Sequence, residues 1–474
     1  MPEFIPSAAL ILVAQEPELR VFLVRRAADQ RFFPDQWTFP GGKLDALDGP
    51  ESDLLSFQFC ALRELLEETG LLPGFGGSAE ALADLRHDLL NGKPFPRILD
   101  LPLLQDLGWR VMPPFAPRRF ETRYFLGTVA ACAQDFALNA ELSEAAWWKP
   151  SELLQKWQKG QILVPPPVRS LVEILASHGR DLERLSALAN DRDTLFADLE
   201  IFPGFEVIPL RTPTLPPATH TNCALIGREQ FVIVDPASPY PEEQALLLNR
   251  IESRIDQGHQ PVSIVLTHHH IDHMGGAVAL RNRLQLPILA HPETARLLAE
   301  QFEIDQLIEE GHVWNLSSDA ALPWILQAIH TPGHDPGHLC LLDLRQNLAH
   351  VGDMLAGIGT ILIEHPEGNM QAYLDSLRRL QSLNLKAVIP SHGPVIHRPS
   401  QTCAEYLAHR EMRENQILAC LEKGAQTEEA LLNEVYAGLA PQLLPLARRS
   451  LLAHLHKLKH EKRLEEQAAV WSKK

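Results

Sequence analysis

The chain has 474 residues, of which 45% are hydrophobic and 22% charged, and its formal net charge at pH 7 is −17. This length predicts two to four domains with enough apolar side chains for separate cores. The acidic balance argues against a nucleic-acid footprint along the whole chain, and no apolar run is long enough to span a bilayer.

The first motif that carries chemistry is FPGGKLD at 39–45, followed by RELLEETGL at 63–71. The apolar pattern of residues 54–69 predicts an amphipathic helix that ends at Gly70. Three carboxylates of this helix fall at i, i+3 and i+4 and share one face: Glu64, Glu67 and Glu68. A divalent cation such as Mg²⁺ would relieve their mutual repulsion. The alternative is an acidic helix face exposed to solvent.

These motifs resemble the Nudix hydrolases over roughly residues 1–180. The resemblance implies an α/β/α sandwich in which Arg63 braces the helix. It also implies that three carboxylates bind Mg²⁺ (or Mn²⁺) and act in catalysis: Glu64, Glu67 and Glu68. The interval from Gly42 to Arg63 is longer than in the Nudix box. Asp48 or Glu51 would therefore replace the usual upstream glutamate.

Within that family, the lengthened box is most similar to the branch that contains coenzyme A diphosphatases. The LVRR segment at 23–26 and the inserted region before RFETRYF at 119–125 support the same branch. This resemblance implies cleavage of the pyrophosphate of a nucleoside-diphosphate derivative such as an acyl-CoA. Three arginines would contact its phosphates, with surface ion pairs as the alternative: Arg118, Arg119 and Arg123.

A polar segment separates the two halves of the chain. WWKPSELL at 147–154 predicts a last strand that turns into a helix, and the prolines at 165–167 lead into another helix. Residues 181–204 are polar and charged and are predicted to form the linker. The proline-rich stretch at 212–217 is placed inside the following domain, as a loop near its first strands.

The most informative motif is THHHIDHMGG at 267–276. It follows the apolar, β-branched run 262–266, which predicts a buried strand. Its imidazoles and carboxylate have the H-x-H-x-D-H spacing of a metal cradle, and zinc favours such nitrogen and oxygen ligands. Three complementary side chains each follow a further predicted strand: His334, Asp353 and His392. Asp235 follows the apolar run 231–234 in a similar way.

As a set, these motifs resemble the metallo-β-lactamase superfamily over residues 205–405, which implies an αββα sandwich. The resemblance implies one metal site formed by His268, His270 and His334. It implies a second metal site formed by Asp272, His273 and His392, with Asp353 bridging both. The two ions would be zinc, manganese or iron, and Asp272 would also act in catalysis. Asp235 would orient a ligand imidazole.

Four further residues near these motifs are weighed separately. His269 is predicted to point to the opposite face from its neighbours, in a structural position, and His330 is also expected to be structural. His338 is either structural or a partner of a metal ligand. Asp335 departs from the superfamily, which more often has a small hydroxyl residue there.

After His392 the pattern becomes helical. Helices are predicted over 400–423, from Thr427 onwards and over 447–459, with a short hairpin at 464–470. Residues 406–474 resemble the winged helix of β-lactamase-like proteins that include a mitochondrial endoribonuclease. Six basic residues would form either an RNA contact or a solvated helix face: Arg448, Arg449, Lys457, Lys459, Lys462 and Arg463.

The six cysteines are scattered and form no C-x-x-C pair, which is typical of buried thiols in a reducing compartment. The N-terminus has no basic region followed by an apolar core and a cleavage site. We therefore expect a cytoplasmic protein with no membrane partner.

Three functions stay open at this point. The first is metal-dependent hydrolysis of an ester, thioester or phosphodiester in the second half of the chain. The second is pyrophosphate cleavage by the Nudix-like half, with a coenzyme A or nucleotide derivative as the small-molecule substrate. The third is a nucleotide-sensing or RNA-binding protein whose Nudix-like domain is inactive.

Overall fold

The computed structural model describes residues 4–15, 17–30, 33–96, 104–112, 119–133, 135–190, 199–317 and 323–474. The chain divides into two compact units, Met1–Glu206 and Val207–Lys474. Each unit mixes helices and strands around its own cores, as the sequence predicts.

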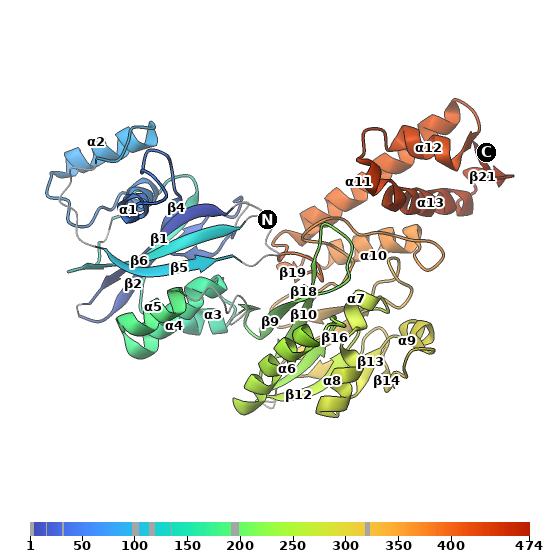
Figure 1. The fold of residues 1–474 in the computed structure, drawn as a ribbon, viewed down its shortest axis with the longest axis horizontal. Helices are drawn as coiled ribbons and strands as arrows, with labels where there is room; N and C mark the ends of the chain where they lie inside the picture. Colours follow the sequence, from blue (N-terminus) through green and yellow to red (C-terminus); the bar gives the residue numbers. More distant parts are fainter. Residues whose placement is uncertain are drawn as a thin grey trace. The chain divides into compact units, whose positions relative to one another are not determined.

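In the N-terminal unit, a mixed sheet lies between two layers of helices (Figure 1). Its strands are β1 (Ile5–Ala14), β2 (Arg20–Arg26), β3 (Trp37–Thr38), β4 (Gly41–Lys43), β5 (Gln105–Val111), β6 (Phe120–Val129) and β7 (Leu142–Trp148). Its helices are α1 (Leu54–Thr69), α2 (Ala79–Leu90), α3 (Pro150–Gln158), α4 (Pro166–His178) and α5 (Leu182–Ala189). The sheet order is β3-β2-β1-β6-β5, with β4 beside β1 and β7 beside β2. One core packs α1 and α2 against the sheet, and the other packs α3, α4 and α5.

Helix α1 carries the three glutamates and begins and ends where the sequence predicts. Asp53 caps its first turn by accepting a hydrogen bond from the Leu55 N–H at 3.1 Å. Gly70 ends it in the left-handed region at φ 77°, with its N–H bonded to the Leu66 carbonyl. Leucines on its inner face are buried in the core: Leu62, Leu65 and Leu66. The packing of this face fixes the direction of the opposite, acidic face.

The segment predicted as a linker, residues 181–204, contains more structure than expected. Helix α5 begins at the cap Asp181 and buries Leu185 and Ala189 in the N-terminal core. Because these two side chains are four residues apart, they share one helical face. The exposed residues Glu183 and Arg184, just before Leu185, give the segment a charged appearance that obscured this short apolar repeat. Residues 191–198 of the predicted linker lie outside the described residues.

The described part of residues 200–389 contains two further sheets. The first has the order β14-β13-β12-β11-β10-β9-β8 and consists of β8 (Glu200–Phe202), β9 (Phe205–Arg211), β10 (His220–Gly227), β11 (Gln230–Val234), β12 (Gln260–Val265), β13 (Ile288–Ala290) and β14 (Gln306–Leu307). The second has the order β15-β16-β17-β18-β19 and consists of β15 (Val313–Asn315), β16 (Ile325–His330), β17 (Leu339–Asp343), β18 (Leu348–His350) and β19 (Ala387–Ile389). The proline-rich stretch 212–217 is the loop between β9 and β10, as predicted.

Helices cover both sheets from outside. They are α6 (Pro241–Asp256), α7 (Ile271–Met274), α8 (Ala277–Leu284), α9 (Pro292–Leu298), α10 (Met370–Ser382) and α11 (Pro399–Glu422). One core packs α6 and α8 on the first sheet, and another packs α10 and the start of α11 on the second. The predicted αββα sandwich is therefore present (Figure 1).

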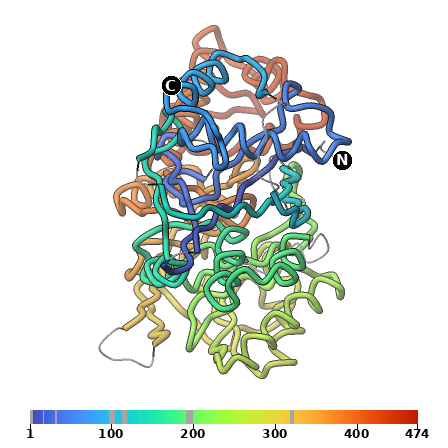
Figure 2. Tube along the Cα trace, turned by 90° about the vertical axis from the view of Figure 1, so that its left-hand side faces the viewer, coloured from blue at the N-terminus to red at the C-terminus, as the bar shows by residue number. Residues whose placement is uncertain are grey.

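The last part of the chain forms a small three-helix and hairpin module. It comprises α11, β20 (Gln426–Thr427), α12 (Glu428–Val435), α13 (Leu444–His460), β21 (Leu464–Gln467) and β22 (Val470–Lys473). Its core lies between α11, α12, α13 and the hairpin. Thr427 caps α12, as predicted. In Figure 2 this red module and the green-to-yellow residues of the first sheet lie at opposite ends of the C-terminal unit. Helix α11 runs through the predicted domain boundary at 405/406.

Candidate metal centres

The metal-cradle residues gather at one edge of the second unit because of strand direction. β16 and β18 both pair antiparallel with β17, so they run the same way, and β19 is parallel to β18. Their carboxyl ends therefore meet at one edge, and one predicted ligand follows each of them: His334, Asp353 and His392. β12 ends at Val265, after which the chain turns into the short helix α7.

Three imidazoles converge on one point. His268 Nε2 and His334 Nε2 each lie 3.0 Å from His270 Nδ1. Nitrogens that share a tetrahedral zinc ion at its usual bond length are separated by roughly 3.3 Å. The structure thus brings together the three residues predicted for the first metal site.

The position of the ring hydrogen on two of these imidazoles favours a cation between them. His268 Nδ1 donates a hydrogen bond to Thr267 Oγ1 at 3.0 Å, and Thr267 Oγ1 donates to Asp235 at 2.6 Å. His334 Nδ1 donates to the Leu362 carbonyl at 2.7 Å. In the neutral rings both Nε2 atoms therefore carry lone pairs that face His270. Converging lone pairs repel unless a cation lies between them.

A second group of side chains lies next to the first. His392 Nε2 is 3.6 Å from Asp272 Oδ2 and 3.5 Å from Asp353 Oδ1. His273 Nε2 is 3.8 Å from both Asp272 Oδ1 and Asp353 Oδ2. Asp353 Oδ2 is also 3.5 Å from His334 Nε2, so this carboxylate faces both groups.

Unpartnered polar atoms show that this second group also fits a cation. Among the residues that the structure describes, His273 Nε2 and Asp353 Oδ1 are buried and make no hydrogen bond. A buried polar atom without a partner is costly, and a metal ion would satisfy both. Both groups of side chains therefore suit divalent metal ions.

The electrostatics of the cluster lower the pKa of two of its imidazoles, His268 and His270, and the nearby carboxylates raise the pKa of two others, His273 and His392. Burial and the neighbouring rings of His334 and His269 lower the pKa of His270 to about 3. The pKa of His268 is also lowered by burial and nearby rings. Burial alone would lower the pKa of His273, but Asp272 and Asp353 raise it to about 10. In the absence of metal this ring holds a proton that metal binding would release.

Partners outside the cluster hold the ligand rings in place. Asp235 accepts a hydrogen bond from His273 Nδ1 at 2.9 Å, as the sequence predicts. His392 Nδ1 donates to the His220 carbonyl at 3.0 Å. Sequence reasoning missed this carbonyl, the Leu362 carbonyl and the Thr267 hydroxyl. Only Thr267 offered a signal, as the hydroxyl residue directly before the histidine run.

The position predicted for His269 is wrong. The chain leaves the strand conformation after Val265, so side-chain alternation does not extend to residue 269. The ring centroid of His269 lies 4.7 Å from that of His270. His269 Nδ1 contacts Asp335, and its Nε2 lies 3.2 Å from Glu367 Oε2. Asp335, the residue that departs from the superfamily pattern, is therefore the partner of His269.

His338 and His330 take different positions. His338 Nε2 accepts a hydrogen bond from the backbone N–H of Asp353 at 3.0 Å, and its Nδ1 donates to Thr331 Oγ1 at 2.8 Å. His338 therefore supports the segment that carries the bridging carboxylate. His330 donates to the Pro336 carbonyl at 2.9 Å and stacks on His291, away from the ligand atoms.

The N-terminal unit holds the acidic cluster. Glu68 Oε2 accepts a hydrogen bond from the Gly41 N–H at 3.3 Å. A Cβ atom at Gly42 would lie 2.4 Å from the Glu64 carboxylate, so the Gly-Gly turn lets the backbone approach α1 closely. Burial raises the pKa of Glu64 to about 7 and that of Glu68 well above its usual range. Glu67 shares this face and is half-buried.

Asp48 is the acidic residue that meets Arg63. The guanidinium donates to both carboxylate oxygens of Asp48, at 2.8 and 2.9 Å, and the Asp48 side chain is fully buried. Arg63 also lies 2.9 Å from Glu64 and 3.0 Å from Glu67. Glu51, the other candidate from the sequence, is exposed. Arg63 therefore holds the loop after Gly42 against the acidic helix.

The raised pKa of Glu64 predicts a pH-dependent stability of the metal-free protein. A carboxyl whose folded pKa lies near 7 rather than 4.5 stabilises the fold below pH 4.5. That contribution is lost as the pH rises through 7, and amounts to about 3 kcal/mol. Thermal unfolding of the full chain in EDTA should therefore show an acid-stabilised transition. Glu64→Gln should flatten its pH dependence, and Mg²⁺ should restore stability at pH 8. An unchanged slope in Glu64→Gln would contradict the assignment.

Two of the three arginines considered for phosphate binding, Arg119 and Arg123, are engaged within the chain. Arg123 Nε donates to Asp106 Oδ1 at 2.9 Å, and its guanidinium lies over the Trp109 ring. Arg119 Nε donates to the Met112 carbonyl at 3.2 Å. Arg118 lies outside the described residues. For Arg123, the geometry matches the ion-pair alternative.

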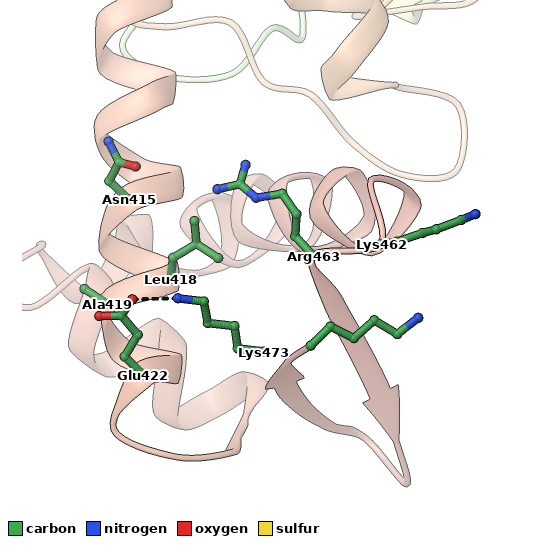
Figure 3. Close-up of a pocket in the computed structure, with 8 residues that line it drawn as sticks. Asn415, Leu418, Ala419, Glu422, Lys462, Arg463 and Lys473 are labelled. Carbon is green, nitrogen blue, oxygen red and sulfur yellow. Dashed lines mark hydrogen bonds and ion pairs between the residues drawn. The ribbon is translucent and has the colours of Figure 1, made fainter.

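Five of the six C-terminal basic residues considered for an RNA contact have acidic partners, and no ion pair of Lys462 is seen among the described residues. Arg449 lies 3.1 Å from Glu364, and other pairs within the module are Arg448–Glu428, Lys457–Glu414, Lys459–Glu466 and Arg463–Glu461. A hollow of about 420 Å³ lies between α11 and the hairpin, and in it Lys473 pairs with Glu422 at 2.6 Å. Figure 3 shows the side chains that line it. These carboxylates reduce the positive charge that a nucleic-acid backbone would need.

Family models match three consecutive parts of the chain. They describe a NUDIX domain over residues 4–164, the metallo-beta-lactamase superfamily over 216–392 and a beta-lactamase associated winged helix domain over 427–471. The chain therefore contains a NUDIX domain, a domain of the metallo-beta-lactamase superfamily and a winged helix domain, in that order. Both of its larger domains belong to hydrolase families. The predicted resemblances to the Nudix hydrolases, the metallo-β-lactamase superfamily and the winged helix are confirmed, as is the fold class.

Three similar proteins are named for the β-lactamase-like fold or for thioesterase activity. A beta-lactamase-like protein 2 homolog of Caenorhabditis elegans is 28% identical over 223 residues, covering 46% of this chain and 71% of that protein. The atrochrysone carboxyl ACP thioesterase AacuM of Aspergillus aculeatus is 31% identical over 205 residues, covering 42% of this chain and 59% of that protein. A beta-lactamase domain protein from Burkholderia ambifaria has a solved structure that is 20% identical, with a TM-score of 0.51, and covers 60% of this chain and 96% of that one. The last similarity shows the fold.

No helix among the described residues combines the length and apolar character needed to cross a membrane.

Proposed function

We propose that the metallo-β-lactamase domain hydrolyses a thioester at a two-metal centre. The observation that carries the proposal is the convergence of seven ligating side chains around buried, unpartnered atoms of His273 and Asp353. The proposed ligands are His268, His270, Asp272, His273, His334, Asp353 and His392. Two zinc ions (or manganese or iron) held there would supply a water of lowered pKa and a polarised substrate carbonyl.

The chain's own residues orient this centre. Asp235 holds His273 with Nδ1 protonated, so that Nε2 faces the centre once its extra proton is lost. The carbonyls of Leu362 and His220 accept hydrogen bonds from Nδ1 of His334 and His392, respectively, so that Nε2 of each ring faces the centre. The pKa of Asp272 is lowered, because nearby His273 and His392 outweigh the effect of its burial. Asp272 therefore stays ionised at neutral pH and can accept a hydrogen bond from the attacking water.

Two observations favour a thioester over a phosphodiester. AacuM is named as a thioesterase that acts on an acyl carrier protein, and its similarity extends over 42% of this chain. The winged helix, which would have to bind the RNA backbone, has most of its basic side chains paired with carboxylates. A charge of −17 on the whole chain adds to the repulsion of a polyanion.

We propose a second activity for the Nudix domain, which is cleavage of the pyrophosphate in a nucleoside-diphosphate derivative such as an acyl-CoA. The acidic face of α1 supports it, because buried carboxylates with raised pKa values would bind Mg²⁺ or Mn²⁺ in exchange for protons. A coenzyme A thioester contains both bonds, so one metabolite could serve both domains.

A substrate panel with metal analysis tests both proposals. The purified full chain should contain about two zinc, manganese or iron ions per molecule, and with added Mg²⁺ it should cleave acyl-CoA at both the thioester and the pyrophosphate. Acyl-glutathione should lose only its thioester, because it lacks a pyrophosphate. RNA cleavage without thioester hydrolysis would overturn the first proposal. Binding of nucleotides without any cleavage would favour the sensing alternative.

A further inference from the structure

The segment of residues 361–367 lies against the metal centre on one side. The Leu362 carbonyl accepts a hydrogen bond from Nδ1 of His334 at 2.7 Å. Glu367 Oε2 lies 3.2 Å from Nε2 of His269, which stands between two ligands in the sequence. This segment therefore sets the orientation of the proposed ligand His334. It also contacts His269, whose neighbours in the sequence are the proposed ligands His268 and His270.

The same segment is held on its other side by α11 and α13. The Ile361 carbonyl accepts a hydrogen bond from Arg410 Nη2 at 2.6 Å. Glu364 Oε2 lies 3.1 Å from Arg449 Nη1. The rings of His365 and His456 stack with centroids 4.0 Å apart at an angle of 22°. Consecutive carbonyls thus face opposite ways, Ile361 toward α11 and Leu362 toward His334.

The segment depends on these contacts for its position. It belongs to no helix or strand, so no regular backbone ladder fixes its carbonyls. The side chains of Ile361 and Ile363 are buried in the core below the second sheet, whereas residues 364–367 are exposed. Arg410 makes the strongest of the outer contacts, because it is buried and its hydrogen bond is charge-assisted. The Arg449 pair is half-exposed and contributes less.

We propose that the winged-helix end of the chain positions the metal ligand His334 through residues 361–367. Arg410, Arg449 and His456 are then positioning residues, which act on the metal centre without touching it. The physical reason is that the Nδ1 partner of a ligating imidazole fixes its tautomer and ring angle, and so tunes its affinity for metal. This inference rests on the proposed metal centre in the second unit.

The test measures metal binding by the full chain. Zinc affinity is determined by chelator competition, and the visible spectrum is recorded after substitution with Co²⁺. Arg410→Met should weaken zinc binding roughly tenfold and shift the cobalt bands, as expected for loss of an outer partner. The surface variant Arg449→Ala/His456→Ala should weaken zinc binding by about threefold, the size expected for the loss of a half-exposed ion pair. Arg449→Lys, which keeps a cation opposite Glu364, should stay close to the parent chain.

Arg448→Ala is the matched control. Arg448 is the preceding residue of α13, but it pairs with Glu428 inside the winged helix and not with residues 361–367. This variant should leave zinc affinity and the cobalt spectrum unchanged. If Arg410→Met does not fold, the surface double variant decides the question by itself. Parent-like affinity and spectrum in that folded double variant would overturn the inference while leaving the metal centre intact. A parent chain that binds no zinc would overturn the proposed function as well.

Discussion

Replacing His268 by alanine is expected to reduce thioester hydrolysis by about a thousandfold, while the pyrophosphatase activity of the Nudix domain stays unchanged. His268 is fully buried, and its Nε2 is one of three nitrogens that converge on the first metal position. Without it, the position keeps only two imidazoles. Loss of an ion there would remove several kcal/mol of transition-state stabilisation, which corresponds to about 10³-fold in rate. Steady-state kinetics on an acyl-CoA, read separately for the two bonds, would measure both effects.

Two matched variants show whether the loss is specific. Glu67→Gln should abolish pyrophosphate cleavage and spare thioester hydrolysis, because its carboxylate lies in the other unit. His312→Ala removes a histidine of the same unit whose ring packs on Trp314 outside the centre, so it should retain both activities. Full thioesterase activity in a zinc-depleted His268→Ala variant would show that another site performs the reaction.

The convergence of the metal-cradle residues could be predicted because each of them directly follows an apolar run. Val262–Leu266, Trp324–Ile329 and Ala387–Ile389 read as buried strands, and the structure has strands at these places. Once the strands are placed in one sandwich, the side chains after their ends have little freedom. The close spacing of His268, His270, Asp272 and His273 in the sequence also indicates that these four side chains lie near one another.

The partners of these residues were largely beyond prediction. Every residue has a carbonyl, so nothing in the sequence distinguishes the Leu362 or His220 oxygen from others. The position of His269 was predicted incorrectly because the strand was extended past Val265 in the sequence, whereas the chain turns there. Asp335 stood out only as a departure from the superfamily, and its contact with His269 depends on a tertiary approach of two loops.

In the N-terminal unit too, local features could be predicted from the sequence, whereas contacts between distant residues could not. The bounds of α1 follow from its apolar spacing, its Asp53 cap and Gly70, all of which are visible in the sequence. Which of Asp48 and Glu51 pairs with Arg63 is not visible in the sequence, because both are acidic residues of one loop. Burial decides it: the Asp48 side chain is fully buried against Arg63, and Glu51 is exposed.

Replacing Arg63 by methionine is expected to lower the free energy of unfolding of the N-terminal unit by about 3–5 kcal/mol, because it removes the buried guanidinium that pairs with the Asp48 carboxylate. Arg63→Met combined with Asp48→Asn should recover part of this loss, since the buried Asp48 charge is removed together with its partner, while Glu64 and Glu67 still lose their contact with Arg63. Arg123→Ala, which breaks the partly exposed pair with Asp106, is the matched comparison and should cost about 1 kcal/mol or less. Urea denaturation of the full chain in EDTA measures all three. If Arg63→Met costs no more than Arg123→Ala, Arg63 is not the brace of the acidic helix. A larger cost would show that the lengthened loop keeps its carboxylates in place through one buried ion pair.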